Sequence, residues 1–327
     1  MPERKRAARQ LNNKNIIILL SFLCLILLLA LLICLGVLIS LDPPAPAVTE
    51  EEEESVPLSS LVRYADTFNV SSEYLQTILP SHLFYRDQGV LVCTPLDERL
   101  PLHDHSWDSL VYDFGRIRYE EEGRPVSYGV DISYFQGNID WQAVATDGID
   151  FAMVRLGYRG YSEGGIFEDE FARANLQGAE EAGLELGAYF FSQAINEEEA
   201  LEEAEFVLEL LEGRELSYPI AFDMEEIDDS SARTANLSVE QRSKITESFC
   251  SAIEKAGYQA IIYGNIPWLA GRLDLPSLRE YPLWLAQYYE RPLFPYAFSI
   301  WQYTESGQVA GISTPVDLNI CFTPDWD

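Results

Sequence analysis

From residue 128 onward, short apolar runs alternate with longer stretches in which apolar residues recur at helical spacing. The apolar runs predict buried strands, and the longer stretches predict helices. Alternation of this kind is typical of parallel strands that are joined by right-handed helical crossovers. Five such strands are expected: Tyr128–Ser133, Asp150–Gly157, Glu185–Gln193, Tyr218–Glu225 and Gln259–Asn265.

Polar residues and glycines indicate where the helices between these strands begin and end. Asn196 has Glu199 three positions later, and Ser238 has Gln241 at the same spacing. In such a pair, the side chain of the first residue can accept a hydrogen bond from the backbone N–H of the residue three positions later. The side chain of that later residue can accept one from the backbone N–H of the first. A glycine follows each helical stretch and favours its termination. The predicted helical stretches are Phe167–Ala182, Asn196–Leu211 and Ser238–Ala256.

Three further apolar runs follow too closely for full helical crossovers. They are Tyr281–Tyr288, Phe298–Thr304 and Val316–Phe322. Eight strands in so short a span favour a small barrel over an open doubly wound sheet. The predicted fold of residues 128–327 is therefore α/β, an irregular TIM-like barrel with five β/α units plus three strands. Only a loop fits before Val316, so we expect the last strand to run antiparallel to the seventh.

Residues 58–127 have the pattern of a small α+β segment that precedes the barrel. Serines open two short helical stretches, Ser59–Asn69 and Ser71–Leu79, and two strands are expected at Phe84–Thr94 and Ser109–Tyr119. This segment contains no pattern that indicates a catalytic or binding site. The simplest interpretation is a spacer, or a collar that packs against the barrel.

The N-terminal region has three parts of contrasting composition. Residues 1–15 are basic, residues 16–41 carry no charge, and residues 42–57 are rich in proline and glutamate. An uncharged stretch of this length predicts a transmembrane helix that contacts the lipid bilayer. The expected arrangement is a cytoplasmic tail, a single-pass anchor in the cell membrane and an extended stalk, with the barrel outside the cytoplasm.

Charge and histidine content exclude several functional classes. The net charge of −31 argues against a nucleic-acid partner, because such a surface repels phosphate. The histidines are His82, His103 and His105. The predicted barrel therefore has no histidine for a Ser-His-Asp triad or for a histidine-ligated zinc site.

Four carboxylates are expected to meet at one rim of the barrel. Asp131 ends the first strand, Asp223 and Glu225 end the fourth, and Asp317 begins the eighth. Asp223 and Glu225 are two positions apart, so both point to the same face of their strand. Neighbouring acids raise one another's pKa, and glycoside hydrolysis requires one protonated and one charged carboxyl group. Acids that cap helices or face water are the alternative.

Aromatic side chains are expected at the level of these acids. Sugars pack their apolar faces on such rings, although each ring could equally belong to the core. The candidates for substrate binding are Tyr189, Tyr263, Trp284, Tyr288, Trp301 and Tyr303. A Ca²⁺ or Mg²⁺ site is a rival use for the acids, but the spacing of a calcium-binding loop is absent. We therefore predict no metal and no cofactor.

The blocks that carry these residues resemble the family 25 glycoside hydrolases, the muramidase-type lysozymes. Six blocks occur in the family's order: Gly129–Trp141, Gly187–Gln193, Pro219–Glu225, Trp284–Tyr288, Trp301–Tyr303 and Val316–Asn319. The resemblance implies the same barrel and cleavage of the β-1,4 bond between N-acetylmuramic acid and N-acetylglucosamine in peptidoglycan glycan strands. It also implies that Glu225 is the general acid, Asp223 its charged neighbour, and Asp131 and Asp317 the remaining acids of the cleft. Phe190 departs from the pattern, since many relatives have histidine there.

The sequence thus predicts a membrane-anchored peptidoglycan hydrolase. Glu225 would protonate the leaving oxygen, and Asp223 would act as nucleophile or assist the substrate's own N-acetyl group. The alternatives are a catalytically silent cell-wall-binding protein that uses the same cleft and a scaffold protein that binds partners through residues 58–127.

Overall fold

The computed structural model describes residues 20–33, 56–323 and 326. The chain divides into two units, Met1–Pro57 and Leu58–Asp327. In the first unit, residues 20–33 form a helix. The predicted basic tail, residues 1–15, and nearly all of the predicted stalk, residues 42–57, lie outside the described residues, so both stay predictions.

The fold prediction is wrong in its transmembrane helix over residues 16–41. Within the described ranges, no helix combines the length and the apolar character that crossing a membrane requires. The predicted contact with the lipid bilayer loses its support with this helix.

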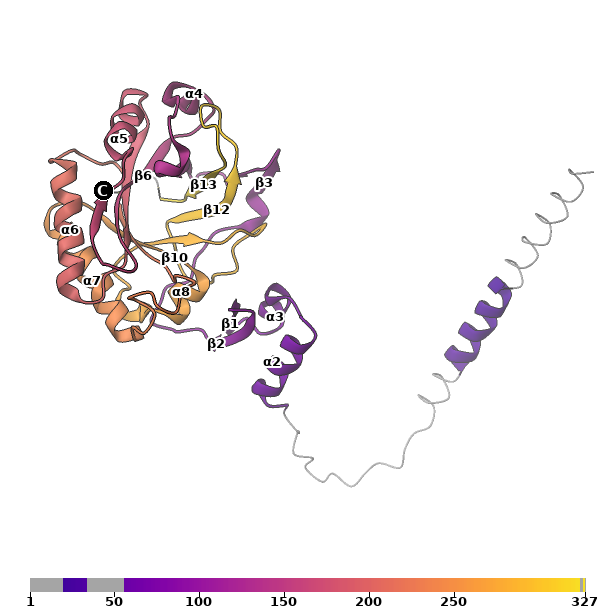
Figure 1. The fold of residues 1–327 in the computed structure, drawn as a ribbon. Helices are drawn as coiled ribbons and strands as arrows, with labels where there is room; N and C mark the ends of the chain where they lie inside the picture. The colour runs from indigo at the N-terminus through magenta and orange to yellow at the C-terminus, as the bar shows by residue number, and fades with distance from the viewer. Residues whose placement is uncertain (1–19, 34–55, 324–325, 327) are drawn as a thin grey trace, which may run out of the picture. The chain divides into compact units, whose positions relative to one another are not determined.

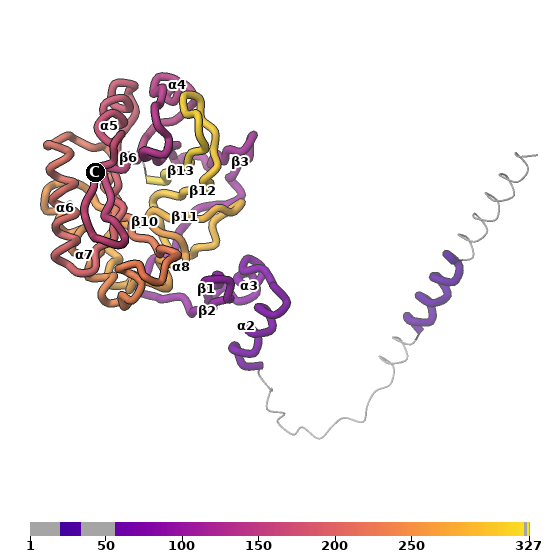
Figure 2. Tube along the Cα trace, in the orientation of Figure 1, coloured from indigo at the N-terminus to yellow at the C-terminus, as the bar shows by residue number. Residues whose placement is uncertain are grey.

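Residues 127–321 form a closed, mixed barrel of eight strands that helices cover on part of its outside (Figure 1). The barrel strands are β5 (Ser127–Ile132), β6 (Phe151–Arg159), β8 (Glu185–Ser192), β9 (Ile220–Met224), β10 (Ala260–Asn265), β11 (Leu283–Ala286), β12 (Ile300–Gly307) and β13 (Val316–Cys321). Pairing of β5 with β6 closes the sheet. The Cα trace follows β10, β11, β12 and β13 across the barrel in this order (Figure 2).

The last strand runs against its neighbours, as the short loop before it predicts. β13 is antiparallel to both β12 and β5, whereas the other neighbouring barrel strands are parallel. This direction places the beginning of β13 beside the ends of the parallel strands. Asp317 is consequently paired in register with Asp131 of β5.

Helices follow the first five parallel strands of the barrel. They are α4 (Trp141–Thr146), α5 (Ala172–Glu181), α6 (Glu197–Leu211), α7 (Val239–Lys255) and α8 (Ile266–Gly271). The predicted caps are present: Asn196 accepts a hydrogen bond from the backbone of Glu199, and Ser238 forms a capping box with Gln241. The helix predicted from Phe167 begins later because β7 (Ile166–Glu168) pairs antiparallel with β6.

Two apolar cores lie on opposite faces of the barrel strands. One cluster contains Phe151, Met153 and Trp284, and a larger cluster contains side chains of the strands and the helices. Close packing inside the barrel requires a glycine on β5, because a Cβ atom on Gly129 would lie 2.3 Å from the ring of Phe151. Both faces of the strands are therefore buried, as is usual in parallel sheets.

Residues 58–126 form two helices and two hairpins. The elements are α2 (Leu58–Thr67), α3 (Ser72–Ile78), β1 (His82–Asp87), β2 (Val90–Pro95), a 3₁₀ turn (Trp107–Ser109), β3 (Leu110–Asp113) and β4 (Arg116–Tyr119). Each strand predicted here is in fact a hairpin, since positive φ angles at Gln88-Gly89 and at Phe114-Gly115 reverse the chain.

Candidate active site

A cavity of about 730 Å³ opens where the parallel strands of the barrel end. Ligand sites of barrel enzymes lie at this end because the loops that follow the strands can vary without disturbing the core. The four predicted carboxyl groups all line the cavity: Asp131, Asp223, Glu225 and Asp317. The structure therefore brings together acids from three strands that are far apart in the sequence.

Asp131 and Asp317 form one pair of acids on neighbouring strands. Asn319 and Gln302 donate hydrogen bonds to Oδ2 of Asp131 at 2.8 and 2.9 Å. Burial, and then the charge of Asp131, raises the pKa of Asp317 to about 9. Burial also raises the pKa of Asp131, while its hydrogen bonds oppose that rise. Asp317 is thus the protonated member of the pair at neutral pH, and Asp131 is stabilised as the charged one.

The amide groups around Asp131 are themselves held in place. Trp284 donates its indole N–H to Oδ1 of Asn319 at 2.8 Å. Tyr263 and Tyr288 donate their hydroxyl groups to Oε1 of Gln302 at 2.9 and 2.8 Å. Each amide must therefore turn its NH₂ group toward Asp131, which fixes the direction of both donors.

Asp223 and Glu225 form the second pair, at the end of β9. Asp223 is 5% exposed, and its Oδ1 has no hydrogen-bond partner within the described residues. Burial, and then the charge of Glu225, raises the pKa of Asp223 well above its usual value. Burial raises the pKa of Glu225 as well, although its hydrogen bond with Asp223 opposes that rise. Burial and mutual repulsion both oppose the state in which Asp223 and Glu225 are charged together, so the pair favours holding one proton between them.

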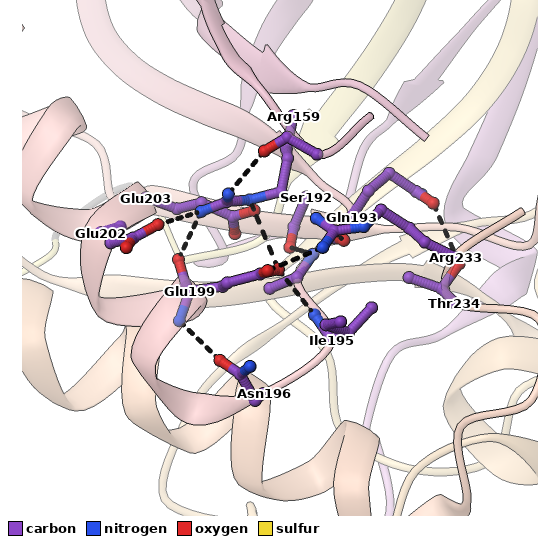
Figure 3. Close-up of polar contacts among 12 residues, drawn as sticks. Arg159, Ser192, Gln193, Ile195, Asn196, Glu199, Glu202, Glu203, Arg233 and Thr234 are labelled. Carbon is purple, nitrogen blue, oxygen red and sulfur yellow. Dashed lines mark hydrogen bonds and ion pairs between the residues drawn. The ribbon is translucent and has the colours of Figure 1, made fainter. Parts of the chain in front are cut away.

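A polar network joins the end of β8 and the beginning of α6 to residues 233–234, in the loop after β9 (Figure 3). Gln193, at the end of β8, lies within 3.4 Å of the carbonyl oxygen of Glu225 and accepts a hydrogen bond from Thr234 at 2.9 Å. Arg233 donates to the carbonyl oxygen of Gln193 and pairs with Glu199 of α6 at 2.7 Å. The loop after β9 is thereby tied to β8 and α6, which limits its movement beside the acids.

Deeper in the same network, Arg159 of β6 is surrounded by acids of α6. Its Nε donates to Oε1 of Glu203 at 2.7 Å, and its Nη2 lies 3.1 Å from Oε2 of Glu202 (Figure 3). Arg159 is 4% exposed and Glu203 is fully buried. Such a pair gives α6 a defined position against the sheet.

The six predicted aromatic residues divide between the cavity and the core. Four of them line the cavity: Tyr189, Tyr263, Trp284 and Tyr288. Trp301 and Tyr303 lie on the other face of β12, in the core outside the barrel, where Trp301 donates to the carbonyl oxygen of Gln287. These two rings do not line the cavity, because alternate residues of a strand point to opposite faces.

Phe190, the departure from the family pattern, also points away from the cavity. It is fully buried and packs edge-on against Phe206 of α6. Its neighbours Tyr189 and Phe191 line the cavity instead. The phenylalanine therefore replaces no polar group in this cavity.

Several residues of the site were not among the sequence candidates. Gln302 lines the cavity, and Asn319 donates to Asp131. Both lie within the family blocks, and their amide groups were a signal that could have found them. Arg155, which pairs with the buried Asp169 at 2.8 Å, had no such signal. In the part of the chain that the structure describes, the cavity included, no group of three or more His, Cys, Asp or Glu residues is arranged to hold a metal.

Comparisons with known proteins extend this description. Residues 130–312 match the model of the glycosyl hydrolases family 25. The chain is 32% identical over 206 residues to the uncharacterized protein YegX of Escherichia coli K12, covering 60% of this chain and 71% of YegX. It is 27% identical over 192 residues to an autolytic lysozyme of Clostridium acetobutylicum, covering 58% of this chain and 54% of that protein.

A solved structure of similar fold is that of the modular autolysin LytC from Streptococcus pneumoniae, in complex with a synthetic peptidoglycan ligand. The TM-score is 0.56 at 25% identity, covering 74% of this chain and 57% of the LytC chain. The chain thus spans little more than half of LytC and of the clostridial lysozyme.

Proposed function

Because this chain belongs to the glycosyl hydrolases family 25 and is a glycoside hydrolase of the lysozyme type, we propose that it cleaves peptidoglycan glycan strands. The bond cleaved is the β-1,4 linkage between N-acetylmuramic acid and N-acetylglucosamine. The observation that carries the proposal is the pair of neighbouring acids Asp223 and Glu225, which lines one aromatic cavity together with Asp131 and Asp317. The synthetic peptidoglycan bound by LytC supports the same substrate class.

Glu225 is the proposed general acid. It follows the last residue of β9 and is less buried than Asp223, so it is the member of the pair better placed to reach the oxygen of a bound glycan. Burial raises the pKa of Glu225, which favours the protonated form that general acid catalysis requires. When Glu225 delivers this proton to the leaving oxygen, the glycosidic bond breaks and positive charge develops at the sugar carbon.

The remaining carboxyl groups are proposed to stabilise that charge. Loss of the shared proton leaves Asp223 as a carboxylate, which either attacks the sugar carbon or orients the N-acetyl group of the substrate. Asp131 keeps its negative charge with the help of Asn319 and Gln302. The fixed amide donors need no rearrangement during the reaction, which is the physical basis of electrostatic preorganisation.

The proposal is tested with Glu225→Gln on purified peptidoglycan. The amide has nearly the shape of the acid but donates no acidic proton, so we expect the rate to fall by roughly 100-fold or more. Glu240→Gln, on the exposed side of α7, is the matched control and should keep the rate of the unmodified protein.

Thermal unfolding of both variants shows whether the fold is retained. A Glu225→Gln protein that is folded and fully active would refute the assigned role. Binding of peptidoglycan by the unmodified protein without any turnover would favour a silent wall-binding protein instead.

A further inference from the structure

One wall of the active-site cavity comes from outside the barrel. Ser72 of α3 and Phe84, Tyr85 and Arg86 of β1 line the same cavity as Glu225. These residues precede residue 130, where the match to the family model begins. Residues 58–127, in which the sequence indicates no catalytic or binding site, therefore contribute to the cleft.

This wall is fixed to the barrel by a set of polar contacts. Arg272, which follows α8, binds both carboxylate oxygens of Asp87 at 2.9 and 3.1 Å. The same guanidinium group lies 3.2 Å from Oε2 of Glu226, the neighbour of Glu225. Gln76 of α3 donates to the carbonyl oxygen of Leu293 at 2.7 Å, in the loop between β11 and β12.

Apolar packing fixes the wall as well. Tyr85 belongs to the large core of the barrel, whereas Phe84 packs with Leu75 and Leu91 in a small core of the segment itself. Because successive residues of β1 point to opposite sides, the strand is held between the two cores. The position of the wall beside the acids is thus built into the fold.

The charges at the wall favour a neutral ligand. Arg86 pairs with Asp66 at 2.8 Å, and Arg272 pairs with Asp87. Each of these guanidinium groups is thus already neutralised by a carboxylate, which leaves little attraction for the carboxylates of a peptide stem. The wall instead offers the hydroxyl group of Ser72.

An exposed aromatic ring also lines the cavity. Tyr289, in the loop after β11, is 60% exposed and lines the same cavity. An aromatic ring and a hydroxyl group in the lining of one cavity suit a sugar, which has apolar faces and hydroxyl edges.

We propose that residues 58–95 form a wall of the substrate cleft and that Ser72 and Tyr289 bind a further sugar ring of the glycan strand. This sugar lies beyond the bond that Glu225 protonates, so the site adds affinity for long strands without taking part in the chemistry. The inference rests on the proposed function, because the ligand is the substrate of that reaction.

The test fills the site by enlarging Ser72. Binding of peptide-free glycan strands is measured calorimetrically on the full chain with Glu225→Gln, so that no turnover is needed. Ser72→Tyr should weaken this binding roughly tenfold or more, and Ser72→Leu should weaken it less, since it fills less of the cavity. Ser59→Tyr is the matched control, because Ser59 lies on the exposed face of α2, and it should leave binding unchanged.

A second measurement separates this inference from the proposed function. With Glu225 intact, Ser72→Tyr should lower kcat/KM for long glycan strands more than kcat/KM for the shortest fragment that the unmodified protein cleaves, because such a fragment does not reach the wall. Turnover of the short fragment that remains also shows that the barrel is folded.

Equal affinity of the Ser72→Tyr and Ser59→Tyr proteins for glycan strands would overturn the inference. Turnover of the short fragment would in that case leave the proposed function standing. If Ser72→Tyr weakened only the binding of peptide-bearing glycan strands, the inference would also be overturned, because the wall would then bind peptide and not sugar.

Discussion

Asp317→Asn is predicted to stabilise the protein at neutral pH while impairing the cleft. The folded chain raises the pKa of Asp317 to about 9, from 3.8 for an unperturbed aspartate. At neutral pH the folded protein therefore binds a proton at Asp317 that the unfolded chain releases. Stability linked to this group is fully present below about pH 4 and is lost as the pH rises toward 9.

The size of the effect follows from the same pKa values. Between pH 3.8 and 7, one proton at ~1.4 kcal/mol per pH unit corresponds to about 4 kcal/mol, which is an upper bound because Asp317 is not fully buried. We expect a gain of about 2–4 kcal/mol for Asp317→Asn at pH 7, since asparagine has the same shape and needs no proton. At pH 4 the gain should nearly vanish.

Urea unfolding at pH 4 and pH 7 measures this difference. The matched control is Asp108→Asn, which changes an exposed aspartate and should alter the free energy of unfolding by less than ~0.5 kcal/mol at either pH. Equal stability of Asp317→Asn and the unmodified protein at pH 7 would refute the reasoning. A gain of the same size at both pH values would also refute it, because it would not come from the proton.

Three further predictions concern the supports of the site. Arg159→Met should destabilise the protein by about 3 kcal/mol or more, because it leaves Glu203 buried without its cation; Arg173→Met, at a half-exposed ion pair, should cost less than ~1 kcal/mol in the same urea titration. Asn319→Ala should cost about 1–3 kcal/mol and raise the pKa of Asp131 further, which would appear as a displaced pH–rate profile. EDTA should leave the rate of peptidoglycan cleavage unchanged, since the proposed steps use carboxyl groups alone; inhibition that Ca²⁺ or Mg²⁺ reverses would contradict this.

Local signals made much of the barrel predictable. The caps at Asn196 and Ser238 depend on hydrogen bonds within four residues, so the sequence places the beginnings of α6 and α7 correctly. Asp131 and Asp223 could be placed at one rim because parallel strands end at the same edge of a sheet. The short loop before Val316 was enough to predict the direction of β13.

Other features depend on which face of a strand points into the barrel. Trp301 and Tyr303 share a face of β12, and Gln302 points the other way, toward Asp131. Both faces of the strand are buried, so hydrophobicity could not tell the cavity side from the core side. The amide group of Gln302 was the better guide to the cavity than the two aromatic rings beside it.

Features that arise from contacts distant in sequence were not predictable. The wall formed by Ser72 and β1 depends on the pair between Asp87 and Arg272, which are far apart in the chain. The hairpin within 84–94 was missed because apolar residues continue on both sides of Gln88-Gly89. In the N-terminal unit, composition alone predicted a membrane-spanning helix that the described residues do not support.

The most direct test of the account is the identity of the sugar at the new reducing ends released from purified peptidoglycan. Reduction of the products with borohydride followed by sugar analysis identifies it. The account predicts N-acetylmuramic acid at these ends, and their loss in the Glu225→Gln protein. New ends that carry N-acetylglucosamine, or peptidoglycan that yields no new reducing ends at all, would contradict it.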